Sequence, residues 1–126
     1  MTLIEVALRD VLMAYTPLTA LISTRLTPVV FPQGATYPRV AYEMISDPGQ
    51  ESGLHNDLIQ YVAQGSTYLS AETVMSQIKA AFDGYSGIKD DLIISSVRPT
   101  GQMSQTCDPT VPVYERTAIF RVIYES

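Results

Sequence analysis

The segment from Phe31 to Tyr42 constrains the fold more than any other part of this 126-residue chain. It opens with the residues FPQGATYP, in which two prolines and a glycine favour a turn or an irregular crossing. The crossing leads directly into an alternating stretch, with Val40, Tyr42 and Met44 on one face. The chain is therefore expected to turn before residue 39 and then to enter a sheet with one buried face.

An amphipathic helix is predicted at the N-terminal end of the chain. Thr2 and Glu5 have the spacing of a capping box, in which each side chain bonds a backbone amide of the first turn. Pro17 is expected to end this helix and to start a brief second one that runs to Ile22. The residues with helical spacing on one face of the first helix are Ile4, Leu8, Val11, Leu12 and Tyr15.

A second main helix is predicted from Ser70 to Asp83. Ser70 is the expected N-cap, and Leu69 with Val74 has the spacing of a hydrophobic staple. Gly84 is expected to supply the left-handed residue that closes the helix. Its expected buried face consists of Val74, Met75, Ile78, Ala81 and Phe82.

Several further segments have the composition and alternation of strands. The segments 39–46 and 58–64 are expected to form an antiparallel hairpin with a long tip. In the last strand, one face carries Tyr114, Ala118, Phe120, Val122 and Tyr124. The predicted strands are Arg25–Val30, Arg39–Ser46, Leu58–Gln64, Leu92–Arg98 and Val113–Glu125.

Two stretches rich in polar residues, Gly and Pro are predicted as long loops, Asp47–Asn56 and Pro99–Pro112. Both exceed the two to five residues that a hairpin needs, and long excursions from a small scaffold usually contact something. The residues proposed here for contacts with a partner are Asp47, Gln50, Glu51, His55, Gln102, Met103 and Gln105.

The order of these elements predicts an α+β fold: a mainly antiparallel sheet of four to five strands, with two main helices packed on one face. A length of 126 residues fits a single domain over residues 1–126. The longest apolar run, Val11–Tyr15, is far below the roughly 20 residues that span a bilayer. With Cys107 as the one cysteine, no intrachain disulfide can form, so a reducing compartment is expected.

No catalytic, cofactor or metal site is predicted. A net charge of -5 and scattered basic residues argue against a protein that grips nucleic acid through phosphates. Cys107 and His55 fall in separate polar segments without a third group to orient a base. Asp83, Asp90 and Asp91 lack the alternating oxygen ligands of a calcium loop. Eight tyrosines are interpreted either as ordinary half-buried strand residues, such as Tyr42, Tyr61 and Tyr114, or as parts of subunit interfaces.

The order and spacing of these segments resemble the tail-completion, or tail-terminator, proteins of long-tailed phages and phage-like particles. No single motif carries the resemblance, which covers nearly the whole chain. The parts of the chain that carry it are Leu8–Leu21, Arg25, Phe31–Gly34, Tyr37–Tyr42, the segment from Tyr68–Glu72 to Phe82–Gly84, Ser96–Arg98 and Tyr114–Val122.

The resemblance implies a structural protein of the virion tail or head-tail junction, assembled in the host cytoplasm. It implies a hexameric ring that caps the head-proximal end of the tail tube, ends tube growth and provides the head-joining surface. The implied partners are further copies of the chain, a tail-tube protein and a head-connector or neck protein, with DNA only in transit and no membrane. The family has no catalytic residues or cofactor. Two alternatives remain: a tail-tube or head-connector subunit of the same particle, and a small α+β ligand-binding domain or enzyme.

Overall fold

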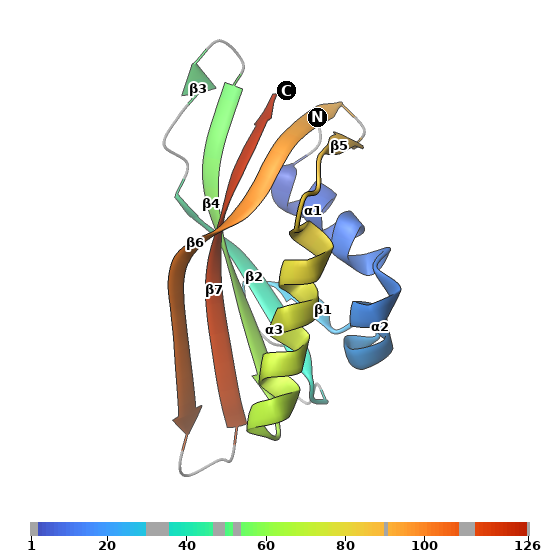
Figure 1. The fold of residues 1–126 in the computed structure, drawn as a ribbon, viewed down its shortest axis with the longest axis vertical. Helices are drawn as coiled ribbons and strands as arrows, with labels where there is room; N and C mark the ends of the chain where they lie inside the picture. The colour runs from blue at the N-terminus through green and yellow to red at the C-terminus, as the bar shows by residue number, and fades with distance from the viewer. Residues whose placement is uncertain are drawn as a thin grey trace.

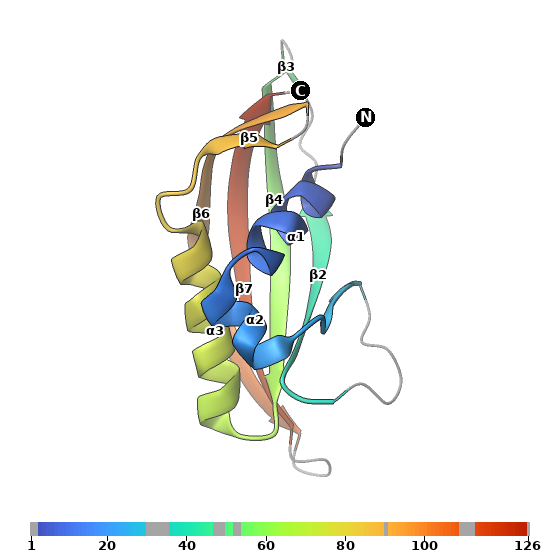
Figure 2. The ribbon, with the colours of Figure 1, turned by 90° about the vertical axis from the view of Figure 1, so that its right-hand side faces the viewer.

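The computed structural model describes residues 3–29, 36–46, 50–51, 54–89, 91–108 and 113–125. In this part of the chain three helices cover one face of a long, curled sheet, and no helix covers the other face (Figure 1, Figure 2). The predicted crossing at Phe31–Gly34 lies outside the described residues. The helices are α1 (Ile4–Met13), α2 (Thr16–Ile22) and α3 (Tyr68–Phe82).

The sheet has seven strands in the described residues, six of them in the order β1-β2-β4-β7-β6-β5, with β3 paired to β4. Of the strand pairs in the described residues, β1 with β2 is the only parallel one. The predicted α+β class and mainly antiparallel pairing are confirmed, whereas the predicted count of four to five strands was too low. The strands are β1 (Leu26–Pro28), β2 (Arg39–Ser46), β3 (Gln50–Glu51), β4 (Leu54–Gly65), β5 (Gly87–Lys89), β6 (Leu92–Asp108) and β7 (Val113–Glu125).

The centre of the sheet is an unbroken ladder of twelve residue pairs between β4 and β7, from Leu54 with Glu125 to Gly65 with Tyr114. The irregularities lie farther out, once in β2 between Met44 and Ser46 and twice in β6. Extra residues on one strand of a pair bend that strand and increase its twist. The bulged outer strands around a regular centre account for the curl of the sheet in Figure 1.

The prediction of a loop from Pro99 to Pro112 is wrong for Pro99–Asp108. These residues continue β6 and pair with β7 as far as Asp108 with Val113. The register shifts between Pro99 and Met103, and Gly101 in this bulge has a φ of 88° that favours glycine. Proline and glycine are tolerated here because a bulge and a sheet edge do not need every backbone bond. Residues 109–112 lie outside the described part.

The predicted loop from Asp47 to Asn56 is also partly wrong, because β4 begins at Leu54 rather than Leu58. Leu54, His55 and Asn56 pair with the last three residues of β7, and β3 pairs with Leu54 and His55. The long β7 supplies backbone partners that the polar side chains of this segment did not suggest. Residues 47–49 and 52–53 lie outside the described part.

The predicted helices form, but both main helices begin differently from the prediction. Leu3 is the N-cap of α1 and makes no side-chain cap bond, so the capping box that placed the N-cap at Thr2 is wrong by one residue. Thr2 itself lies outside the described residues. The predicted apolar face is confirmed: Ile4, Leu8, Val11 and Leu12 are buried, and Tyr15 packs against the core.

In α3 the N-cap is Thr67, whose side-chain hydroxyl oxygen accepts from the Ser70 backbone N–H at 3.1 Å. The prediction of Ser70 as the cap is therefore wrong by three residues. Leu69 is 72% exposed, which contradicts the predicted staple with Val74. The expected closure at Gly84 is confirmed by its φ of 70°.

Three aromatic rings from different elements form the centre of the core. Tyr61 of β4, Phe82 of α3 and Phe120 of β7 are all buried, with ring centroids 5.3 to 5.6 Å apart. Tyr42 is buried beside them at 6.1 Å from Tyr61. These two tyrosines are thus core residues of this chain, rather than half-buried or interface residues. Tyr114 is half-buried.

The hydroxyl group of Tyr61 has no hydrogen-bond partner among the described residues. Burial also raises the pKa of Tyr61 far above its usual value of about 10. A buried hydroxyl without a partner lowers the stability of the folded chain, because it loses its hydrogen bonds to water on folding and gains none in return.

We expect Tyr61→Phe to raise the free energy of unfolding by about 1 kcal/mol, because it removes this desolvated group and keeps the ring. Above about pH 10 the unfolded chain loses the Tyr61 proton while the folded chain keeps it, so stability falls as pH rises. Tyr61→Phe should therefore also flatten the alkaline decline. Urea unfolding at pH 7 and pH 10.5 measures both effects. The control Tyr124→Phe removes a hydroxyl that donates to Asp57 at 2.6 Å and should lower stability instead. Equal losses in both variants would contradict the prediction.

Candidate assembly surfaces

The structure separates the predicted partner-contact residues into two groups at opposite ends of the sheet (Figure 1). Gln50 and Glu51 in β3 and His55 in β4 lie at the end where β7 finishes, which we call the upper end. The second group lies in the latter half of β6, towards the lower end, and not in a loop. It consists of Gln102, Met103 and Gln105, of which Gln105 is exposed. Asp47 lies outside the described residues.

His55 belongs to a compact polar and aromatic cluster at the upper end. Its ring stacks on that of Tyr124, with centroids 4.6 Å apart and planes 6° apart. The Tyr124 hydroxyl donates to Oδ2 of Asp57, which is only 1% exposed. Breaking a hydrogen bond buried to this extent would leave polar groups without water and without a partner, which is costly. The cluster therefore fixes β4 against β7 where the upper end begins.

An exposed aliphatic row crosses the upper end on the face without helices. Four residues on adjacent strands lie side by side on this face, because each pairs with the next: Leu54 of β4, Glu125 of β7, Ile93 of β6 and Ile88 of β5. Leu54 is 45%, Ile93 50% and Ile88 73% exposed. With exposed or half-buried neighbours they form what we call the upper apolar patch: Ile45, Leu54, Leu58, Ile88, Ile93 and Ile123.

Charged side chains border this patch. Arg98 of β6 pairs with Arg121 of β7, and Arg121 pairs with Leu58 of β4. Arg121 donates to the Asn56 side chain at 3.0 Å, and Arg98 is exposed. Glu125 lies in the aliphatic row itself. The upper apolar patch thus has a basic margin towards the middle of the sheet.

The lower half of the same face is polar and bonded to itself. Arg39 Nε donates to Gln64 Oε1 at 2.8 Å, and Gln64 Nε2 donates to Glu115 Oε2. These bonds cross β2, β4 and β7, and the Arg39 guanidinium also lies 4.5 Å from the Tyr37 ring centroid. Among the described residues of this face, the large aliphatic side chains that are exposed therefore lie in its upper half: Ile45, Leu54, Ile88 and Ile93.

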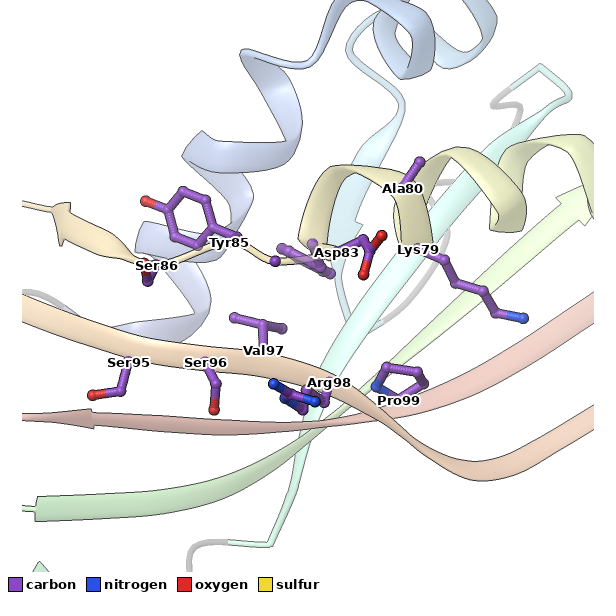
Figure 3. Close-up of a pocket in the computed structure, with 12 residues that line it drawn as sticks. Lys79, Ala80, Asp83, Tyr85, Ser86, Ser95, Ser96, Val97, Arg98 and Pro99 are labelled. Carbon is purple, nitrogen blue, oxygen red and sulfur yellow. The ribbon is translucent and has the colours of Figure 1, made fainter.

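A groove of about 570 Å³ separates the C-terminal end of α3 from β6 (Figure 3). One side of the groove has Lys79 of α3 with Asp83 and Tyr85 just after it, and Val97 of β6 points towards them from the other side. Burial raises the pKa of Tyr85.

Within the described residues no group of His, Cys, Asp and Glu could hold a metal ion. No helix described here is long and apolar enough to cross a membrane.

No protein-family model matches the sequence, and no curated protein matches it. Among the solved structures that are similar to this chain, two share the fold over nearly its whole length. A chain in the virion of a native gene transfer agent particle gives a TM-score of 0.73 at 16% identity, covering 98% of this chain and 95% of that chain. The bacteriophage SPP1 gp17 protein gives a TM-score of 0.57 at 16% identity, covering 97% of this chain and 87% of that chain. At this level of identity the likeness establishes a common fold.

Proposed function

We propose that this chain is a structural protein of a phage or phage-like particle. In this proposal, six copies form a ring that caps the head-proximal end of the tail tube, ends tube growth and joins the tail to the head connector. The observation that carries it is the likeness to a chain of the gene transfer agent virion, which extends over 98% of this chain rather than over one motif. The ring, the tail-tube partner and the head-connector partner are proposed because the order and spacing of the sequence segments resemble those of tail-completion proteins.

The surfaces of the molecule support an assembly role. The helix-free face carries the upper apolar patch, and the two ends of the sheet differ in composition. A subunit with two different ends suits a closed ring, because a cyclic axis leaves two unlike faces for two unlike neighbours. The tube would meet one face and the head connector the other.

Electron microscopy of particles made without this chain tests the proposal. Cells that lack its gene should produce tubes of uncontrolled length and heads without tails. Adding the purified chain to growing tubes should stop their growth and place a ring at one end of each tube. Tubes that stay of normal length and join heads in the absence of the chain would contradict the proposal.

The likeness to a virion component supports a second candidate equally, a tail-tube or head-connector subunit of the same particle. A tube subunit is expected to stack axially. If the purified chain alone assembles into long tubes, the tube subunit is the better assignment.

A further inference from the structure

We infer that copies of this chain associate head to tail, with the outward side of α1 of one copy seated on the upper apolar patch of the next copy. The inference rests on the proposed ring, for which it names the two contacting surfaces.

The outward side of α1 exposes two apolar side chains near its N-terminal end, although the helix already buries its other side in its own core. Leu3, at the N-cap, is 54% exposed and Val6 is 43% exposed. With the exposed Asp10 they follow at i, i+3 and i+7, which places them on one side of the helix. The first turn of α1 therefore offers an exposed apolar surface, with acidic residues beside it, in addition to its buried face.

The upper apolar patch lacks the layer that covers the opposite face of the same sheet. A sheet normally buries each apolar face against a helix or another sheet. The three described helices all lie on one face, so the aliphatic row at Leu54, Ile93 and Ile88 faces outward in the single copy. An apolar helix surface is what the chain itself uses to cover a sheet.

The two surfaces belong to opposite faces of the sheet in the upper half of the molecule, and the curl of the sheet brings its β5 edge beside α1 (Figure 1, Figure 2). The helices, including α1, lie on one side of the sheet, and the patch lies on the other. A contact between unlike surfaces leaves one free surface of each kind after every addition, so it repeats and closes into a ring when the rotation fits. A symmetric dimer would require one surface to contact itself.

The basic margin of the patch is complementary to the acidic residues of α1. On α1, Glu5 and Asp10 are acidic, while Nε of Arg9 donates to the Leu26 carbonyl of the same copy at 3.3 Å. The patch has Arg98 and Arg121 along its inner margin, with Glu43 and Glu125 elsewhere on the same face. Complementary charges of this kind mainly select the orientation of a contact. They favour a docking in which the acidic residues of α1 lie towards the middle of the neighbouring sheet.

Cysteine cross-linking tests the contact directly. In a Cys107→Ser background, one chain carries Val6→Cys and a second chain, with a different tag, carries Ile93→Cys. Mixed under mild oxidation, they should give at least tenfold more of the mixed dimer than either chain gives of its own dimer. A chain with both substitutions should give a ladder that ends at the ring size. The native side chains at Val6 and Ile93, and at the control position Leu69, are all exposed. The cysteine variants should therefore keep the melting temperature of the parent chain, which confirms that they fold.

The matched control replaces Val6→Cys with Leu69→Cys, which is 72% exposed at the start of α3 and belongs to neither surface. Equal cross-linking of the Leu69 and Val6 variants to Ile93→Cys would overturn the inference, as would its absence at every concentration up to the solubility limit. A predominant Ile93 homodimer would do the same. Rings seen in a sample without the Val6–Ile93 cross-link would leave the proposed function standing and remove this contact. A cross-linked ladder from a chain that does not cap tubes would support this contact and contradict the proposed function.

A charge exchange gives a second readout of the same contact. Asp10→Arg and Arg98→Asp should each reduce the Val6–Ile93 cross-link several-fold, and the mixture of the two variants should recover it. A recovery that fails, with both variants folded, would contradict the orientation given to α1.

Discussion

Replacing Phe120 with alanine is expected to lower the free energy of unfolding by about 3–5 kcal/mol, the usual range for a fully buried Phe. Phe120 is 0% exposed at the middle of β7, between Ile59 of β4 and Pro99 of β6. Its ring lies edge-on to Tyr61 at 5.6 Å and to Phe82 at 5.3 Å. Removing it would leave a cavity where β4, β7 and α3 meet, because the central ladder cannot shift to fill the space.

Urea unfolding followed by circular dichroism measures this loss. Since domains of this size are stable by about 5–15 kcal/mol, Phe120→Ala should be partly unfolded at moderate temperature. The control Leu69→Ala removes a side chain of 72% exposure and should change stability by less than about 0.5 kcal/mol. Similar small losses in both variants would mean that the aromatic cluster is not the centre of the core.

Gly65→Ala is expected to have the second largest effect, a loss of about 2 kcal/mol. A Cβ at Gly65 would lie 2.8 Å from the Ala71 backbone nitrogen and 2.9 Å from the Ser70 Cβ. Both neighbours belong to the first turns of α3, so the helix start would have to move away from the end of β4. The gain from a less flexible unfolded chain, about 0.4–1 kcal/mol, offsets only part of this strain.

The same substitution at Gly87 is the matched control. Gly87 is also a strand glycine, and a Cβ there meets nothing nearer than the Tyr85 hydroxyl oxygen at 3.4 Å. Gly87→Ala should be neutral or slightly stabilising. Thermal melting of both variants measures the difference, and a Gly65→Ala variant as stable as Gly87→Ala would show that α3 starts farther from β4 than described.

The sequence was sufficient to predict the elements in which apolar side chains repeat regularly. It was insufficient where pairing with a distant strand decides whether a segment forms a strand or a loop. The faces of α1, α3 and β7 could be predicted because their apolar residues have one period each. The latter half of β6 could not, because Pro99 and Gly101 disfavour a regular strand and only the pairing with β7 compensates for them. The start of β4 was missed for the same reason.

The candidate surfaces were predictable only in part. Gln50, Glu51 and His55 do lie at one end of the sheet, but His55 stacks on Tyr124 and is half-buried. The aliphatic row at Leu54, Ile93 and Ile88 depends on the register of four strands from three separate segments. Register across such sequence distances is not visible in any local pattern, so exposed isoleucines could not be told from core residues.

The central β4–β7 ladder also determines the order in which the chain can fold. Its partners are far apart in sequence, from Gly65 with Tyr114 to Leu54 with Glu125, and such distant contacts form slowly. Before they form, β2 with β4 and β6 with β7 can exist only as separate ribbons, which are marginally stable in water. The aromatic core therefore cannot close until β7 has been synthesised, and folding of the sheet is expected to be one late, cooperative step.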